Sequence, residues 1–201
     1  DLHAGQIQGF FDIPVDNLYS SPVFALDVRH NFKKPEDITV VSPDVGGVAR
    51  ARELAERIKA DLAIVDKRRA KPGLVSEMRI IGDVKGRICL IVDDICDTAG
   101  TLVKAVDLLL NNGAIEVHAY ISHGVLSNPA VDRIESSNIK SLVVTDSIEP
   151  SVFVKKSTKI RVVPASPMLA QAMLNIAHGS SVSSLFDDET LGPIYEAYYP
   201  E

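Results

Sequence analysis

The sequence predicts an α/β fold with a mainly parallel β-sheet flanked by helices, and three observations carry this prediction. Short apolar runs rich in β-branched residues alternate with amphipathic stretches of helical length, which is typical of a sheet covered by helices on both faces. Several runs end in clusters of Gly, Asp and Thr, as strand-to-helix turns do. The 201 residues are 46% hydrophobic, so one ordinary domain can bury a sizeable core.

Taken in order, the chain begins with a segment that we interpret as the end of a strand, a short helix or turn and an extended stretch, 1–18. Helical spacing predicts helices at 23–31, 48–60, 102–110, 129–136 and 167–177. Apolar runs predict strands at 38–42, 62–66, 78–81, 87–93, 115–122, 141–145 and 160–163. We expect His118 and His123 to be structural, and we assign no role to the acidic, Tyr-rich tail.

Composition excludes several classes of protein. The formal net charge of −6 argues against nucleic acid or a membrane as the main partner. No apolar run has transmembrane length, and we expect no signal peptide. The two cysteines, Cys89 in a predicted strand and Cys96 in a predicted loop, are too few for a disulfide framework, which favours the reducing cytoplasm.

The stretch 88–101 predicts an anion site between a strand and a helix. An apolar run, 88–92, should form a buried strand that ends at Asp93 and Asp94, and a turn of small residues, 97–101, leads into a helix. The first turn of a helix leaves N–H groups unpaired and carries a partial positive charge. A phosphate is therefore the natural guest.

The side chains of the turn refine this prediction. Ala99 and Gly100 let a phosphate approach the backbone, and Thr98 and Thr101 add hydroxyl donors. The three aspartates of the stretch would repel a bare phosphate, but an ionised carboxylate accepts hydrogen bonds from hydroxyl groups. A sugar phosphate satisfies both requirements, because its phosphate can bind the amides of the turn and its hydroxyl groups can donate to the aspartates. A divalent cation could lie between the phosphate and the aspartates. The alternative is an acidic turn in which Asp97 is a plain N-cap.

Two further segments predict contacts with phosphate. The turn 43–47 after strand 38–42 carries Asp44, whose carboxylate beside a phosphate would suit Mg²⁺; the alternative is a helix N-cap. The basic run 67–73 follows strand 62–66, which we expect to lie beside the aspartate strand. Ligands of open α/β sheets bind outside the carboxyl ends of strands, so this run can fold over phosphates. Its alternative is a solvated loop.

The motif LIVDDICDTAGT resembles the phosphoribosyl-pyrophosphate (PRPP) motif of type I phosphoribosyltransferase folds, and it is most similar to that of ribose-phosphate pyrophosphokinases. The same family is resembled by DLHAGQIQGFFDIPVDNL, VVSPDVGGVARA, IVDKRR, MRIIGDVKGR and SVSSLF. The resemblance implies a type I phosphoribosyltransferase-like fold. It also implies a diphosphotransferase that converts ATP and ribose 5-phosphate into PRPP and AMP for nucleotide biosynthesis.

The resemblance assigns roles to residues of this chain. It implies that Lys67 and Arg69 are catalytic and that His3 and Asp44 lie at Mg²⁺, although a His near a terminus is by itself most often a surface residue. The implied ribose 5-phosphate site comprises Arg69, Asp93, Asp94, Asp97, Thr98, Ala99, Gly100 and Thr101. A regulatory phosphate or ADP site would draw on Asp16, Asn17, Ser181 and Ser183.

The family's enzymes are longer than this chain and form hexamers built from dimers. We therefore expect 1–21 to be the remnant of a missing N-terminal half, 22–165 the phosphoribosyltransferase-like domain, and 166–201 a C-terminal helix and tail. In the family the adenine pocket belongs largely to the N-terminal half. This chain is accordingly expected to bind ribose 5-phosphate or PRPP with Mg²⁺ without useful turnover of ATP.

Three alternative functions would each account for part of the sequence. A base phosphoribosyltransferase would share the loop and sheet, but the DLH and KRR segments favour the pyrophosphokinase. A non-catalytic regulatory homologue would tend to lose the loop cations or the aspartates, and both are present. In a phosphoaspartate protein the spacing Asp94-x-x-Asp97 and the Thr-x-Gly-Thr loop would have no place.

Overall fold

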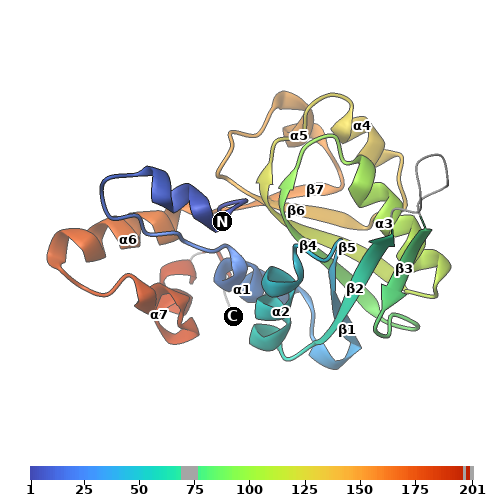
Figure 1. Cartoon of the computed structure of the whole chain (residues 1–201), viewed down its shortest axis with the longest axis horizontal. Coiled ribbons are helices and arrows are strands. Elements are labelled where there is room, and N and C mark those ends of the chain that lie inside the picture. The colour runs from blue at the N-terminus through green and yellow to red at the C-terminus, as the bar shows by residue number, and fades with distance from the viewer. Residues whose placement is uncertain (69–76, 197, 200–201) are drawn as a thin grey trace.

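The computed structural model describes residues 1–68, 77–196 and 198–199 and contains a seven-stranded sheet in the order β3-β2-β1-β4-β5-β6-β7 (Figure 1). The strands are β1 (Ile38–Ser42), β2 (Asp61–Arg68), β3 (Glu77–Ile81), β4 (Ile88–Cys96), β5 (Glu116–Gly124), β6 (Ser141–Thr145) and β7 (Ile160–Val163). Neighbouring strands are parallel except β2 and β3, which are antiparallel. The predicted mainly parallel α/β sheet is therefore confirmed.

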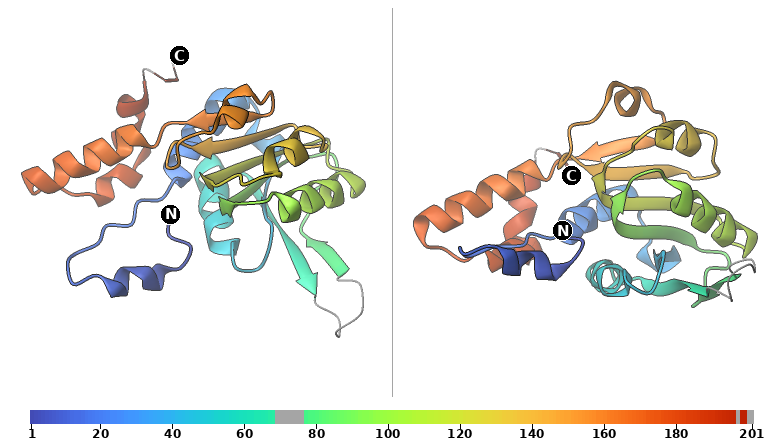
Figure 2. Two further views of the ribbon diagram at one scale, coloured as in Figure 1. Left: turned by 90° about the horizontal axis from the view of Figure 1, so that it is seen from above. Right: turned by 45° about the horizontal axis from the view of Figure 1, so that its top comes forward.

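Helices cover both faces of the sheet (Figure 2). The α-helices are α1 (Ser21–Asn31), α2 (Val48–Ile58), α3 (Gly100–Asn111), α4 (Ala130–Glu135), α5 (Val152–Lys156), α6 (Ser166–His178) and α7 (Asp188–Tyr195). The 3-10 turns are η1 (Gly5–Phe10), η2 (Pro35–Asp37) and η3 (Ser183–Phe186). α5 and α7 were not predicted from the sequence, whereas the other helices match the predicted ones within a few residues.

Each face of the sheet has its own apolar cluster. On one face α3 and α4 pack against the strands, and α3 does so because Leu102, Ala105, Val106 and Leu109 recur at helical spacing and are buried. On the other face α1, α2, α6 and α7 share a second cluster. Strands between the two clusters are apolar on both sides, which explains the continuous runs in the sequence.

The C-terminal tail has a structural role that its sequence did not reveal. Leu191 and Tyr195 of α7 are buried in the cluster that also holds Phe24 of α1. The Tyr195 hydroxyl donates a hydrogen bond of 2.7 Å to the carbonyl of Pro164. The tail thus packs against α1 and α6 beside the sheet, and the division at 22–165 and 166–201 stays a prediction.

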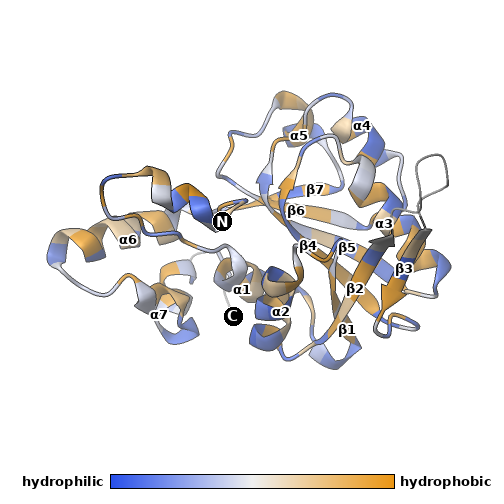
Figure 3. Ribbon diagram, viewed as in Figure 1, coloured by the Kyte–Doolittle hydropathy of each residue, from blue (hydrophilic) through white to orange (hydrophobic). Residues whose placement is uncertain are grey.

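The N-terminal segment and α6 project from the same side of the sheet (Figures 1 and 2). Both contain apolar residues (Figure 3), and several of these have exposed side chains. Phe10 is 87% exposed and Met173 is 65% exposed. An exposed apolar surface of this kind is typical of a region that another segment of the protein or a partner protein covers.

Three details differ from the sequence predictions. β4 does not end at the aspartates but continues to Cys96, because its pairing with β5 extends to Cys96 opposite Gly124. Cys96 is consequently a buried strand residue and not a loop residue. β2 does not lie beside β4, since β1 pairs with both and separates them.

The basic run begins inside a strand. Lys67 and Arg68 end β2 and pair with Met78 and Glu77 of β3. The remainder of the run, which includes Arg69, lies outside the described residues. Of the helices that the structure describes, none combines the length and the apolarity needed to cross a membrane.

Candidate functional site

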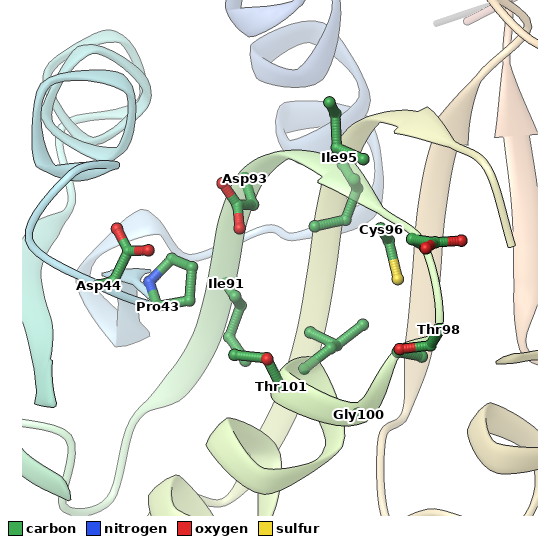
Figure 4. A pocket seen from close by; sticks show the side chains of 13 residues that line it. Pro43, Asp44, Ile91, Asp93, Ile95, Cys96, Thr98, Gly100 and Thr101 are labelled. Atoms are coloured by element: carbon green, nitrogen blue, oxygen red, sulfur yellow. The ribbon is translucent and has the colours of Figure 1, made fainter. Parts of the chain in front are cut away.

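A pocket of about 270 Å³ opens where β1 and β4 end and α3 begins (Figure 4). It lies at the carboxyl edge of the parallel strands, where open α/β sheets bind ligands. Its lining residues are Pro43, Asp44, Ile91, Asp93, Ile95, Cys96, Asp97, Thr98, Ala99, Gly100, Thr101, Leu102 and Ile121. The structure therefore brings the whole predicted phosphate turn, Asp44 and Asp93 into one pocket.

The turn into α3 depends on a left-handed residue. Ala99 is the N-cap of α3 and has φ of 58° and ψ of 8°. This conformation costs an L-residue about 1–2 kcal/mol, so it persists only where the surroundings enforce it. The side chain of Ala99 makes no capping hydrogen bond, so the N-cap residue itself leaves the first-turn amides of α3 for a ligand.

Asp97 is not the N-cap, so the simple alternative for this turn is wrong. One of its carboxylate oxygens accepts a hydrogen bond from the Ser127 hydroxyl. Arg133 of α4 donates to the carbonyl of Thr98, and the amide of Leu126 donates to the carbonyl of Cys96 at 3.0 Å. The turn is thus held from the segment after β5, which pre-organises it for an anion.

Gly100 leaves room that the fold itself does not use. A Cβ placed there would meet only the Arg133 guanidinium at 3.6 Å and the Thr98 hydroxyl at 3.9 Å, which are ordinary contacts. The glycine is consequently not required by packing. Its absent side chain instead leaves the start of α3 accessible from the pocket.

Asp93 and Asp94 lie on opposite faces of β4, because neighbouring strand residues alternate. Asp93 lines the pocket, and burial raises its pKa to about 6 although the amide of Asp94 donates to its Oδ1 at 2.9 Å. Asp94 is buried on the other side. Burial alone would raise the pKa of Asp94, but the bond from His3 and the charge of Arg50 hold it below its usual range.

Arg50 joins the two aspartates and was missed by sequence reasoning. From the first turn of α2, its Nη1 donates to Asp93 Oδ1 at 3.3 Å and its Nη2 lies 3.1 Å from Asp94 Oδ2. Its Nε lies 3.6 Å from Asp1 Oδ1. One signal could have found it: α2 follows the turn 43–47, which was expected to face phosphate, so a cation in its first turn lies close to the predicted site.

The residues expected at Mg²⁺ do not form one ligand group. Asp44 lines the pocket, and its Oδ1 accepts a 2.9 Å hydrogen bond from the amide of Gly47. His3 instead donates from Nδ1 to Asp94 Oδ2 at 2.8 Å, behind β4. Among the residues that the structure describes, no three His, Cys, Asp or Glu side chains are arranged to hold a metal ion.

The residues of the expected regulatory site lie outside the pocket. Asp16, Ser181 and Ser183 are exposed, and Asn17 is half-buried. The rings of Tyr19 and Phe186 are 5.7 Å apart, which joins the N-terminal segment to η3. The two segments that carry these four residues are therefore in contact, but no ligand role follows from that alone.

Comparison with known proteins gave matches along the whole chain. Residues 67–187 match the model of the phosphoribosyl synthetase-associated domain. A ribose-phosphate pyrophosphokinase of Cereibacter sphaeroides is 68% identical over 200 residues, which is 99% of this chain and 60% of that protein. One of Brucella melitensis biotype 1 is 58% identical over 93% of this chain and again 60% of the relative. The chain thus spans 60% of the length of these curated relatives.

The fold is also similar to that of a solved structure. The phosphoribosylpyrophosphate synthetase of Mycobacterium smegmatis superimposes with a TM-score of 0.81 at 35% identity, covering 90% of this chain and 58% of that one. The predicted fold is confirmed by this likeness together with the strand order.

Proposed function

Because this chain belongs to the phosphoribosyl synthetase-associated domain family, we propose that it carries the sugar-phosphate site of a ribose-phosphate pyrophosphokinase. The reaction transfers diphosphate from ATP to O1 of ribose 5-phosphate and gives PRPP and AMP. One observation supports this most strongly: a pre-organised helix start and the Asp93 carboxylate line the same pocket. The first suits a phosphate and the second suits hydroxyl groups.

In this proposal the turn 97–101 binds the 5-phosphate through the amides at the start of α3 and the hydroxyls of Thr98 and Thr101. Asp93 accepts hydrogen bonds from the ribose hydroxyls. Asp94 was expected to do the same, but its position behind β4 supports an indirect part through Arg50. The loop and the carboxylate together orient the sugar and thereby reduce the entropic cost of the reaction.

Lys67 and Arg69 are proposed to neutralise charge on the transferred phosphates. Such transfers depend mainly on positioning and electrostatic stabilisation. The position of Lys67 supports this role, because β2 is parallel to β1 and β4 and ends at the same edge of the sheet. Arg69 would in addition contact ribose 5-phosphate.

Mg²⁺ fits the donor set in part. It prefers carboxylate and phosphate oxygens and keeps several waters, so Asp44 beside a bound phosphate is a suitable ligand. His3 is proposed as a second contact, through the ring nitrogen that does not bond to Asp94. When bound, the ion would offset the negative charge of the ATP phosphates.

The remaining parts of the proposal concern the complete assembly. ATP is the second substrate, and the family implies a homo-oligomer, a hexamer, located in the cytoplasm. Phosphate or ADP would act as a regulator at Asp16, Asn17, Ser181 and Ser183. The contact between Tyr19 and Phe186 supports a shared site, because it joins the two segments involved.

The test uses the variant Gly100→Ala. The fold has room for the added methyl group. A phosphate bound at the start of α3 would clash with this methyl group. We expect the Kd for ribose 5-phosphate, measured by calorimetry, to rise at least about tenfold. This is the effect expected from the loss of one hydrogen bond to a charged group. Gly9→Ala is the matched control, because the fold also has room for a methyl group there: a Cβ at Gly9 meets nothing within 4 Å.

Binding of plain ribose distinguishes the proposed phosphate contacts of the turn 97–101 from the proposed sugar contacts of Asp93. The weaker binding of ribose should not change in Gly100→Ala, because ribose has no phosphate. If ribose 5-phosphate binds equally well to Gly100→Ala and to the wild type, the phosphate assignment is wrong. The same conclusion holds if the wild type does not bind ribose 5-phosphate.

A further inference from the structure

We propose that Arg50 is a positioning residue of this site, which fixes the orientation of the Asp93 carboxylate by tying it to Asp94 and Asp1. The inference rests on the proposed function, because it assigns Asp93 the ribose hydroxyls. Arg50 itself does not line the pocket. It would therefore act through Asp93 rather than by touching the sugar.

The geometry at Asp93 defines which oxygen is available. Oδ1 accepts from Arg50 Nη1 at 3.3 Å and from the amide of Asp94 at 2.9 Å. Both of these donors reach Oδ1, and the carboxyl group of Asp94 also interacts with this carboxyl group. Two donors on one oxygen prevent the carboxylate from rotating freely and leave Oδ2 for a ligand in the pocket.

The guanidinium is itself anchored from behind β4. Its side chain is only 18% exposed, and the carboxylates of Asp94 and Asp1 face two of its nitrogens at 3.1 Å and 3.6 Å. Asp1 is fixed in turn, because its Oδ2 accepts from the amide of Ser20 at 3.1 Å, from the Ser20 hydroxyl and from the Ser122 hydroxyl. Asp93 is thus connected to a rigid set of groups.

Only arginine can make this connection at one position. A guanidinium presents its donors in a fixed plane, so three nitrogens can face three carboxylates at once. An ammonium group is a single charged point on a flexible stem. Arg50→Lys should therefore keep the charge but lose part of the orientation, whereas Arg50→Gln loses both.

The experiment measures the Kd of the chain for ribose 5-phosphate and for inorganic phosphate by calorimetry, with circular dichroism to confirm folding. Arg50→Gln should raise the Kd for ribose 5-phosphate about tenfold or more, the effect of one charge-assisted hydrogen bond. The Kd for phosphate should stay within about twofold, because the turn 97–101 does not contact Arg50. Arg50→Lys should lie between Arg50→Gln and the wild type.

A control and a double variant make the test specific. Arg57 lies on the same helix with a similar exposure of 19% and pairs with Glu53 and Asp188, so Arg57→Gln should change neither Kd. In an Asp93→Ala background, which removes the acceptor of the Arg50 hydrogen bond, Arg50→Gln should add no further loss, because two residues that act through one interaction are not additive.

The outcomes separate this inference from the proposed function. Equal losses of ribose 5-phosphate and phosphate, additive losses in the double variant, or an unchanged Kd for ribose 5-phosphate would each overturn the role of Arg50. Wild-type protein that binds ribose 5-phosphate no better than phosphate would overturn the proposed function, and the inference with it.

Discussion

Replacing Asp93 by asparagine should make the protein more stable at neutral pH and weaken its binding of ribose 5-phosphate. The carboxylate is partly buried and burial raises its pKa from 3.8 to about 6. Asparagine has the same shape, and its amide oxygen can still accept the bonds from Arg50 and from the amide of Asp94. The substitution therefore removes an unfavourable buried charge and keeps the packing.

The size of the effect follows from the pKa difference. About two pKa units at 1.36 kcal/mol each give an upper limit of about 3 kcal/mol. The Asp93 side chain is 30% exposed, so solvent screens part of this energy and we expect about 1–2 kcal/mol. The native state binds the proton more tightly than the unfolded state. The wild-type free energy of unfolding therefore falls as the pH rises from about 4 through about 6.

Urea unfolding of both proteins at pH values between about 4.5 and 8 tests this. The stability advantage of Asp93→Asn should grow through that window and level off above pH 7. Calorimetry at pH 8 should show weaker binding of ribose 5-phosphate by the variant, which is a trade of function for stability. An advantage that does not change with pH, or a variant less stable than wild type at pH 8, would refute the reasoning.

Two predictions concern the scaffold, and urea unfolding measures both. Gly82→Ala should lower the free energy of unfolding by about 2 kcal/mol or more, because φ is +111° and a Cβ would lie 2.9 Å from Ala63; Gly86→Ala, at φ +71° in open space, should cost only about 1 kcal/mol. Equal losses would contradict the clash. Arg161→Met should cost about 3–5 kcal/mol, because it leaves the fully buried Asp27 charge without its two bonds from Arg161; a loss under about 1 kcal/mol would contradict this.

The sequence was sufficient for the features that depend on local chemistry. The run 88–92 is β-branched and apolar, so its assignment as a buried strand needed no knowledge of neighbours. The turn 97–101 is built of small residues before an amphipathic helix, and the structure places it in the pocket as expected. The fold class followed from the same local patterns, repeated along the chain.

Other features depend on long-range pairing and could not be read locally. The length of β4 is set by its register with β5, and this register decides that Asp93 faces the pocket whereas Asp94 does not. The left-handed residue of the turn is Ala99 and not Gly100. This could not be predicted, because the residue type that signals such a conformation in a sequence is glycine and not alanine. Arg50 belongs to α2 and the aspartates belong to β4, so only the folded chain brings them together.

The sharing of one guanidinium links the beginning of the chain to a pocket that it does not touch. Arg50 faces Asp1 and Asp94 on one side of β4 and Asp93 on the other, and His3 competes with it for Asp94. A ligand that donates a hydrogen bond to Oδ2 of Asp93 reduces the negative charge that Oδ1 presents to Arg50, so this cation interacts more strongly with the two carboxylates behind the strand. If an occupied pocket strengthens the pairing of Arg50 with Asp94, then by linkage a stronger pairing of Arg50 with Asp94 raises the affinity of the pocket by the same factor. A contact that draws Asp94 toward His3 would act in the opposite direction. The surroundings of His3 should therefore change when the pocket is occupied, and the NMR signals of its ring measure this change.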